Sequence, residues 1–322
     1  MPTIRYDDVS ITLSESETVL DALIRAGINT PHSCRAGACH SCLVRASSGS
    51  PPPASQKGLK ASLVQKGYFL ACTAQPEADL VVGPAAADDV SVRGSVVAVE
   101  PLSETVSLAR VRLDGPFEFS AGQFVNLVRS DGLARSYSVA SLPNGRNELE
   151  LHVRQIPGGR MSGWLCRGEA LGASIEVRGP AGDCFYLGDE DEDLLLVGTG
   201  TGLAPLLGIT RDAIRAGHRG RLTVYHGGLD ERGLYLTDEL RRLDDDHDFL
   251  TYEPCVLRGD PKPGLHVGAL DQVVLERHAQ LADLRIYLCG DPDLVLSLRK
   301  KLYLAGANLS HIHADAFLSP PA

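Results

Sequence analysis

Three cysteines lie close together in one short stretch of this 322-residue chain, SCRAGACHSCLVR, at Cys34, Cys39 and Cys42, and a fourth, Cys72, follows well downstream in YFLACTAQP. Structural zinc sites usually take their ligands from two separated C-x2-C turns. A C-x4-C-x2-C run with one distant partner is instead the spacing of a [2Fe–2S] cluster. Gly37, inside the run, leaves room for backbone N–H groups near the sulfides. The pattern predicts an iron–sulfur site, with zinc and four merely structural thiols as the alternatives.

Composition limits the partners that such a chain can have. It is 43% hydrophobic and 22% charged, as in an ordinary globular protein long enough for two or three domains. A formal net charge of −10 and a pI near 5.5 argue against a nucleic-acid or anionic-membrane partner. No export signal is visible, and the most apolar window, residues 194–208, is too short to span a bilayer. We therefore expect a cytoplasmic protein without a membrane partner, whose eight cysteines bind metal or are buried as thiols.

The first region, residues 1–85, should form a small sheet with one helix. Alternating residues at 3–6 and 9–13 predict a hairpin. Residues 17–27 should be helical and end at Gly27. Four apolar residues should form the buried face of this helix: Val19, Leu20, Leu23 and Ile24. The Ala- and Pro-rich stretch 83–89 resembles a linker.

Residues 90–187 contain short alternating segments separated by turn residues, which predicts an antiparallel β-barrel with one helix near residues 160–168. A strand expected at 137–141 is preceded by Arg135 and Ser136 and contains Tyr137 and Ser138. A cation can meet a cofactor phosphate, an aromatic ring can stack on a flavin, and a hydroxyl can reach the flavin nitrogen that takes a hydride. An ordinary strand carrying a tyrosine is the alternative.

A second motif in this region, GGRMS, places Gly159, Met161 and Ser162 at the start of the expected helix. Free N–H groups at a helix N-terminus favour a phosphate, although any Gly-initiated helix has the same pattern. Each motif is weak alone, and their order along the chain strengthens the flavin interpretation.

Residues 191–322 begin within the acidic run 189–193 and alternate apolar strands with helices, which predicts a parallel sheet covered on both faces. The expected strands are 194–198, 222–227 and 284–290, and the expected helices are 203–217, 234–243 and 292–306. The last helix has clear end signals, with Asp291 as N-cap, Pro292 at the first position and Gly306 beyond its end.

A glycine-rich turn, GTGTG, connects the first of these strands to its helix, with Gly198, Gly200 and Gly202 in alternation. Such a turn lets the backbone approach a pyrophosphate. The spacing departs from the G-x-G-x-x-G fingerprint, and a glycine turn without a ligand is the alternative. Cys289 and Gly290 end a later strand, at the sheet edge where open α/β sheets bind ligands.

Together these regions resemble the ferredoxin–NADP reductase superfamily, and more narrowly the three-domain NADH-dependent reductase components of bacterial oxygenases. The motifs RSYS, GGRMS, GTGTGLAP and CGDP stand in that family's order. The resemblance covers essentially the whole chain and implies a multidomain fold. It comprises a β-grasp plant-type ferredoxin domain (1–85), an antiparallel β-barrel FAD domain (90–187) and an α/β parallel-sheet NAD domain (191–322). His40 departs from the family, which commonly has a small residue there, and we expect it to face solvent rather than to bind the metal.

The resemblance also implies roles for individual residues. The cluster ligands would be Cys34, Cys39, Cys42 and Cys72. The flavin would contact Arg135, Ser136, Tyr137, Ser138, His152, Val153, Arg154, Gly159, Met161 and Ser162, with Phe317 close to its face. The NAD site would comprise Gly198, Thr199, Gly200, Thr201, Gly202, Cys289, Gly290 and Asp291. Ser138 and Cys289 are the candidates for a direct influence on hydride transfer.

The implied activity is electron transfer from NADH, through FAD and a [2Fe–2S] cluster, one electron at a time, to a terminal oxygenase, which would be a di-iron monooxygenase or a Rieske dioxygenase. We expect a monomer. Asp230 and Glu231, beside Arg232, should repel the 2′-phosphate of NADPH and favour NADH. Two alternatives stay open: a reductase for another acceptor, such as a deoxysugar-forming dehydratase, and a non-enzymatic module that binds zinc and a nucleotide.

Overall fold

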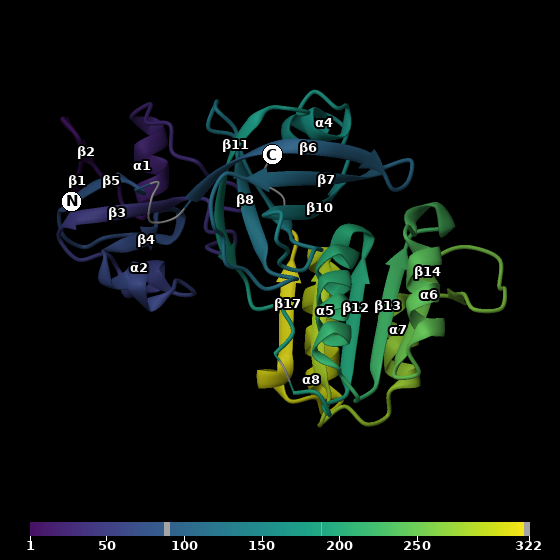
Figure 1. The fold of residues 1–322 in the computed structure, drawn as a ribbon. Helices are drawn as coiled ribbons and strands as arrows, with labels where there is room; N and C mark the ends of the chain where they lie inside the picture. Colours follow the sequence, from purple (N-terminus) through teal and green to yellow (C-terminus); the bar gives the residue numbers. More distant parts are fainter. Residues whose placement is uncertain (87–90, 188, 319–322) are drawn as a thin grey trace.

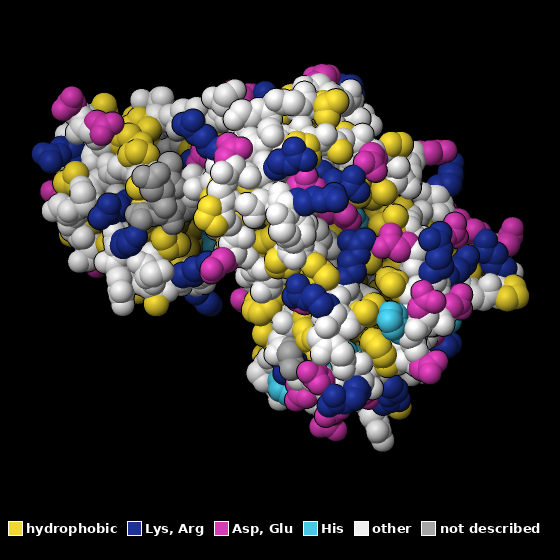
Figure 2. Space-filling view, viewed as in Figure 1, with side chains coloured by type: hydrophobic (Ala, Val, Ile, Leu, Met, Phe, Trp, Pro, Cys, Tyr) yellow, Lys and Arg dark blue, Asp and Glu magenta, His cyan; other side chains and the backbone are white. Residues whose placement is uncertain are grey.

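Each of the three sequence regions forms its own sheet in the computed structural model, which describes residues 1–86, 91–187 and 189–318. We call these the cluster unit, the barrel unit and the α/β unit, in chain order. The barrel unit lies between the other two (Figure 1). Basic and acidic side chains are interspersed over all three units on the face that Figure 2 shows. No helix of the described ranges combines the length and apolar character needed to cross a membrane.

The cluster unit is a five-stranded mixed sheet in the order β2-β1-β5-β3-β4. Its strands are β1 (Thr3–Tyr6), β2 (Val9–Thr12), β3 (Leu43–Ser48), β4 (Tyr68–Leu70) and β5 (Leu80–Pro84). Its helical segments are α1 (Val19–Arg25), η1 (Pro53–Gln56), α2 (Ala61–Gln65) and η2 (Ala71–Thr73). The predicted hairpin is present as the antiparallel β1–β2 pair. This mixed sheet with its packed helix has the expected β-grasp arrangement.

Helix α1 forms as predicted, but its buried face differs by one residue. Thr18 caps its start by accepting a hydrogen bond from the Asp21 N–H at 3.2 Å, and Gly27 follows its end with a φ of +75°. The buried residues are Val19, Leu20, Ala22 and Leu23. The prediction for Ile24 is wrong, since its side chain is 37% exposed. Successive helix residues are rotated by about 100°. This rotation places Ile24 at the edge of the buried face, whose centre lies near Leu23.

The predicted linker 83–89 also begins too early. Gly83 and Pro84 belong to β5, where they pair with Arg45 and Val44 of β3. Only the sheet pairing distinguishes these residues from a linker, because Gly and Pro are poor strand formers. Residues 87–89 lie outside the described ranges.

The barrel unit is a six-stranded antiparallel sheet in the order β10-β7-β6-β11-β8-β9. Its elements are β6 (Ser91–Pro101), β7 (Val106–Leu113), β8 (Phe124–Val128), β9 (Ala134–Ser138), β10 (Glu148–Arg154), α4 (Arg160–Cys166) and β11 (Ser174–Ala181). A bridge between Val139 and Leu151 joins the two outer strands and closes the barrel. The strand expected at 137–141 is β9, which begins and ends three residues earlier. The whole RSYS motif therefore lies within β9.

The α/β unit is a parallel sheet in the order β15-β14-β13-β12-β16-β17. Its strands are β12 (Leu194–Thr199), β13 (Leu222–Gly228), β14 (Leu250–Val256), β15 (His266–Val267), β16 (Arg285–Gly290) and β17 (Ile312–Ala316). Its helical segments are η3 (Gly200–Gly202), α5 (Leu203–Ala216), η4 (Glu231–Gly233), α6 (Thr237–Asp246), α7 (Leu270–Arg277), α8 (Pro292–Leu304) and η5 (Leu309–His311). Asp291 caps α8 as predicted. The helix expected at 234–243 begins later, because Leu236 adopts a left-handed φ of +54°.

Alternation along β12 shows that helices cover both faces of this sheet. Leu194 and Leu196 pack in a core with residues of α5 and α6, whereas Leu195 and Val197 pack in a second core with residues of α7 and α8. Successive strand residues point to opposite faces, so the two helix pairs lie on opposite sides. The chain runs from β12 to β13 on one side and later to β16 on the other. The carboxyl end of β12 is therefore the topological switch point, where such sheets bind ligands.

Candidate functional site

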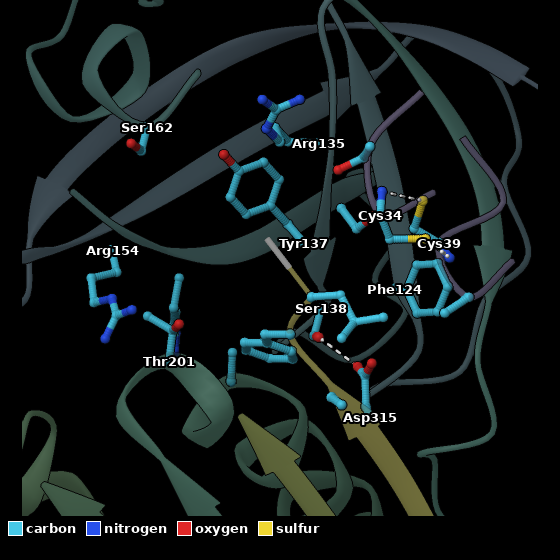
Figure 3. A pocket seen from close by; sticks show the side chains of 18 of the residues that line it. Cys34, Cys39, Phe124, Arg135, Tyr137, Ser138, Arg154, Ser162, Thr201 and Asp315 are labelled. Atoms are coloured by element: carbon cyan, nitrogen blue, oxygen red, sulfur yellow. Dashed lines mark hydrogen bonds between the residues drawn. The ribbon is translucent and has the colours of Figure 1, made fainter. Parts of the chain in front are cut away.

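A cavity of about 200 Å³ lies where the three units meet (Figure 3). Cys34 and Cys39 border it on one side, and Thr201 of the glycine-rich turn borders it on the other. Nine residues predicted to bind flavin or NAD line it: Arg135, Ser136, Tyr137, Ser138, His152, Arg154, Ser162, Thr201 and Phe317. Residues from distant parts of the chain are thus brought to one enclosed space.

The four cysteines of the cluster unit are buried as two pairs. The N–H groups of Cys39 and Ala36 donate to Cys34 Sγ at 3.4 and 3.3 Å, and the Cys34 N–H donates to Cys39 Sγ at 3.4 Å. Hydrogen bonding with Cys39 lowers the pKa of Cys34, and hydrogen bonding with Cys42 lowers the pKa of Cys72. One thiol of each pair is therefore prepared to become the thiolate that a metal needs.

This pairing fits a two-iron cluster better than zinc. Zinc would need four sulfurs around one point, whereas a [2Fe–2S] cluster takes two cysteines on each iron. The backbone N–H groups that surround Cys34 Sγ are the donors that tune such a cluster. His40 is half-buried with its ring 6.3 Å from that of Phe124, so the expectation that it faces solvent is wrong.

Strand β9 supplies four consecutive residues of the cavity wall on the barrel side, Arg135 to Ser138. Tyr137 stands between Arg135 and Ser138 in Figure 3, and burial raises its pKa, which keeps the phenol neutral. Burial lowers the pKa of Arg135, and its guanidinium donates to the neighbouring Ala134 carbonyl at 2.7 Å. A half-buried guanidinium bonded to a neutral carbonyl is well suited to meet a cofactor phosphate.

Ser138 faces a carboxyl group that the sequence did not single out. Its hydroxyl donates to Asp315 Oδ2 at 3.2 Å, drawn as a dashed line in Figure 3. Asp315 lies on β17 directly beside Cys289 of β16, and burial raises its pKa to about 6. The α/β unit thus places a titratable carboxyl group beside Ser138 of the RSYS motif.

Cys289 itself does not line the cavity. Its side chain is buried, and burial together with a hydrogen bond to Cys184 raises its pKa. The Cys289 backbone, however, contacts the glycine-rich turn, since a Cβ on Gly202 would stand 2.3 Å from the Cys289 carbonyl oxygen. Its proposed influence on hydride transfer stays a prediction, and the structure gives it a backbone contact through which to act.

Gly290 and Gly200 of the predicted NAD site are glycines for different physical reasons. A Cβ on Gly290 would lie 2.6 Å from the Thr199 carbonyl oxygen, so packing requires glycine there. Gly200 has a φ of +52°, and a Cβ there would have only Arg154 Nη1 nearby, at 3.8 Å. Thr199 Oγ1 accepts from the Asp291 N–H at 3.1 Å. The turn is therefore tightly packed against β16 and open at Gly200, next to the barrel.

The helix motif of the barrel unit is also held tightly. Ser162 Oγ accepts from the Ile156 N–H at 3.1 Å, and a Cβ on Gly159 would approach that oxygen to 2.4 Å. Gly159 is thus needed to admit the serine that lines the cavity. Val153, Gly159 and Met161 do not line the cavity themselves, and their cofactor contacts stay predictions.

His152, which lines the cavity from β10, has one neighbour in the α/β unit and one on its own strand. Its Nδ1 lies 2.9 Å from the Tyr235 hydroxyl of the α/β unit, and its Nε2 lies 3.5 Å from Glu150 Oε1. Burial alone would raise the pKa of Glu150, but its contacts with His152 and Arg211 outweigh burial and lower the pKa to about 2. An ionised carboxylate only accepts, so a ring proton on Nε2 would face Glu150 and would leave Nδ1 to accept from the Tyr235 hydroxyl.

Sequence reasoning missed eight residues of the lining: Ser33, Ala38, Phe124, Ile156, Ala204, Asp315, Ala316 and Leu318. Asp315 had a possible signal, because it stands in HADAF two residues before Phe317. The others are small or apolar residues whose sequence context resembles that of ordinary core positions.

Comparison with known proteins agrees with this geometry. A 2Fe-2S iron-sulfur cluster binding domain matches residues 3–77, an oxidoreductase FAD-binding domain residues 93–186, and an oxidoreductase NAD-binding domain residues 196–300. The chain is 34% identical to the reductase component (ferredoxin–NAD(P)(+)) of a Pseudomonas putida naphthalene 1,2-dioxygenase system, over 95% of each chain. It is 33% identical to the reductase subunit of an Amycolatopsis aromatic O-demethylase, over 94% of each. A crystal structure of an Amycolatopsis cytochrome P450 reductase superposes with a TM-score of 0.70 at 30% identity, covering 98% of this chain and 99% of that one.

Proposed function

Since the chain belongs to the family of reductase components that join a 2Fe-2S domain, an FAD-binding domain and an NAD-binding domain, we propose that it transfers electrons from NADH to a terminal oxygenase. The electrons pass through FAD and a [2Fe–2S] cluster, one at a time. A single observation carries this proposal. One cavity is bordered by two cluster cysteines, by the RSYS strand and by the glycine-rich turn.

When bound, FAD and the [2Fe–2S] cluster would supply the redox chemistry that links a two-electron donor to one-electron transfer. The chain's own residues position and enclose them. Arg135 offers its charge to a phosphate, Tyr137 offers an aromatic face, and Ser138 offers a hydroxyl held by Asp315. Cys34, Cys39, Cys42 and Cys72 hold the cluster. No catalytic nucleophile is required of the protein.

The preference for NADH rests on the loop after β13. Asp230 pairs with Arg232 at 2.9 Å, and Glu231 pairs with Lys262. These ion pairs occupy the basic side chains that a 2′-phosphate would need, while the carboxylates oppose its charge. NADPH should therefore be the poorer donor.

The acceptor is the least constrained part of the proposal. The relatives named above belong to a dioxygenase system and to an O-demethylase, and the acceptor of this chain is proposed to be a terminal oxygenase of one of these kinds. We further propose that the protein acts as a monomer in the cytoplasm. None of the eight cysteines forms a disulfide, as expected in a reducing compartment.

Anaerobic absorbance spectra of the purified protein, recorded before and after NADH and then NADPH, test the proposal. Flavin and iron–sulfur absorbance should bleach with NADH in two phases, flavin first. Equally fast bleaching with NADPH would contradict the donor preference alone. A colourless protein that carries zinc would contradict the reductase function as a whole.

A further inference from the structure

Asn126 lies at a position where strand alternation predicts exposure, yet it is only 2% exposed. Its neighbours Val125 and Leu127 point into the barrel core, so Asn126 and Phe124 belong to the outer face of β8. That outer face is covered by the cluster unit. The ring of His40 lies 6.3 Å from that of Phe124 in a T-shaped contact.

The Asn126 amide bonds to both units at once. Its Oδ1 accepts from the hydroxyls of Ser41 and Ser136, each at 2.8 Å, and its Nδ2 donates to the Cys39 carbonyl, also at 2.8 Å. Ser136 is its cross-strand partner on β9, next to Tyr137 in the cavity wall. All of these groups are buried or partly buried, so the bonds are shielded from water.

The backbone of the cluster loop is shaped for this contact. His40 stands between Cys39 and Ser41 with a left-handed φ of +56°, a conformation that is unfavourable for a residue with a side chain. It lets the Cys39 carbonyl and the Ser41 hydroxyl point to the same amide. A strained residue beside a metal ligand persists only where its surroundings determine it, and here those surroundings include β8.

We propose that Asn126 is the positioning residue that docks the cluster on the flavin site and thereby sets the rate of electron transfer between them. This inference rests on the function proposed above. In the step concerned, the cluster gains one electron as the flavin loses one, the flavin's proton is released to water, and no bond of the protein forms or breaks. Asn126 does not touch the reacting groups. It acts through Cys39, which borders the cavity.

The test compares Asn126→Leu, which keeps the side-chain volume and removes all three hydrogen bonds, with the parent holoenzyme in anaerobic stopped-flow reduction by NADH. The flavin phase should keep its rate within twofold, and the cluster phase should slow at least tenfold. Asn144→Leu is the matched control. The Asn144 amide also donates and accepts, but within the turn that leads into β10, to Arg146 and Glu148, and neither phase should change in this variant.

Two readouts do not depend on activity. Loss of docking should increase the radius of gyration of Asn126→Leu in small-angle scattering and should alter the visible circular dichroism of the oxidised cluster. Iron and sulfide analysis confirms that the cluster is present. If Asn126→Leu does not retain the cluster, Ser41→Ala, which removes one of the three hydrogen bonds, replaces it in the test. The cluster phase should then slow by a smaller factor. A cluster phase and a scattering profile equal to the parent's would overturn the inference, whereas a parent that NADH does not reduce would overturn the proposed function.

Discussion

Asp315 leads to a quantitative prediction about pH. Its pKa is raised from 3.8 to about 6 by burial, although the residue keeps partial exposure to the cavity that it lines. One pKa unit corresponds to about 1.4 kcal/mol, so a shift of about two units is worth at most about 3 kcal/mol. The folded protein binds this proton more tightly than the unfolded chain does. The resulting stability is present below about pH 4 and is lost as the pH rises through about 6.

Replacing this carboxyl by an amide should remove that pH dependence. Asp315→Asn should match the parent near pH 4 and exceed it in free energy of unfolding by up to about 3 kcal/mol near pH 7.5. Urea titrations followed by circular dichroism across this range measure the difference. Asp260→Asn, at an exposed loop position, controls for the change in net charge.

The same substitution should change flavin reduction. Hydride transfer adds negative charge to the cavity, and an ionised Asp315 beside Ser138 opposes it. The parent should therefore be reduced by NADH faster below about pH 6 than above, and Asp315→Asn should show no such step. Parallel loss of stability in parent and variant between pH 4 and 7.5, with the same pH dependence of reduction, would refute the reasoning.

Three further substitutions separate the parts of the site. Gly202→Ala places a Cβ 2.3 Å from the Cys289 carbonyl oxygen and should slow NADH-dependent reduction at least tenfold in a steady-state assay, with flavin and cluster still bound. Gly145→Ala, where the added Cβ meets open space, should have no effect in the same assay. Tyr235→Phe removes the hydroxyl that bonds to His152 Nδ1 and should slow flavin reduction about tenfold in stopped flow, which corresponds to a barrier higher by about 1.4 kcal/mol. Tyr225→Phe, which removes the comparable bond to His278, should leave that rate unchanged. Cys42→Ser should abolish the iron–sulfur absorbance and the electron paramagnetic resonance signal of the reduced cluster while flavin reduction by NADH continues. Loss of flavin reduction together with the cluster signals would argue against separate sites.

The sequence predicted the elements with strong local signals and missed those that depend on their neighbours. Strands β12, β13 and β16 are rich in apolar residues, as is typical of buried parallel strands, and α8 has both end signals. Strand β14 contains Pro254, which argues against a strand. It is tolerated because β14 meets β15 only from Cys255 onward. Strand β17, IHADA, is short and polar and is defined by its pairing with β16.

The site shows the same division. The cysteines and the RSYS and glycine motifs could be found because their chemistry depends on close spacing in sequence. The contacts of Asn126, Tyr235 and Asp315 could not be predicted, because each of these residues bonds to a partner in another unit. A polar residue on the outer face of a strand is ordinary in a sequence. Only the packed structure shows that a second unit covers Asn126.

Strand β9 explains why these interfaces are coupled. Ser136 bonds through Asn126 to the cluster loop, and Ser138 bonds to Asp315 of the α/β unit. The two serines are two residues apart, about 7 Å along a strand, with Tyr137 between them. A one-residue slip of β9 against β8 would turn both serines to the other face and break both contacts at once. The register of β9, set by its pairing with β8, therefore fixes the approach of the electron donor and that of the electron acceptor relative to the same aromatic side chain. Neither approach can be adjusted by moving this strand without disturbing the other.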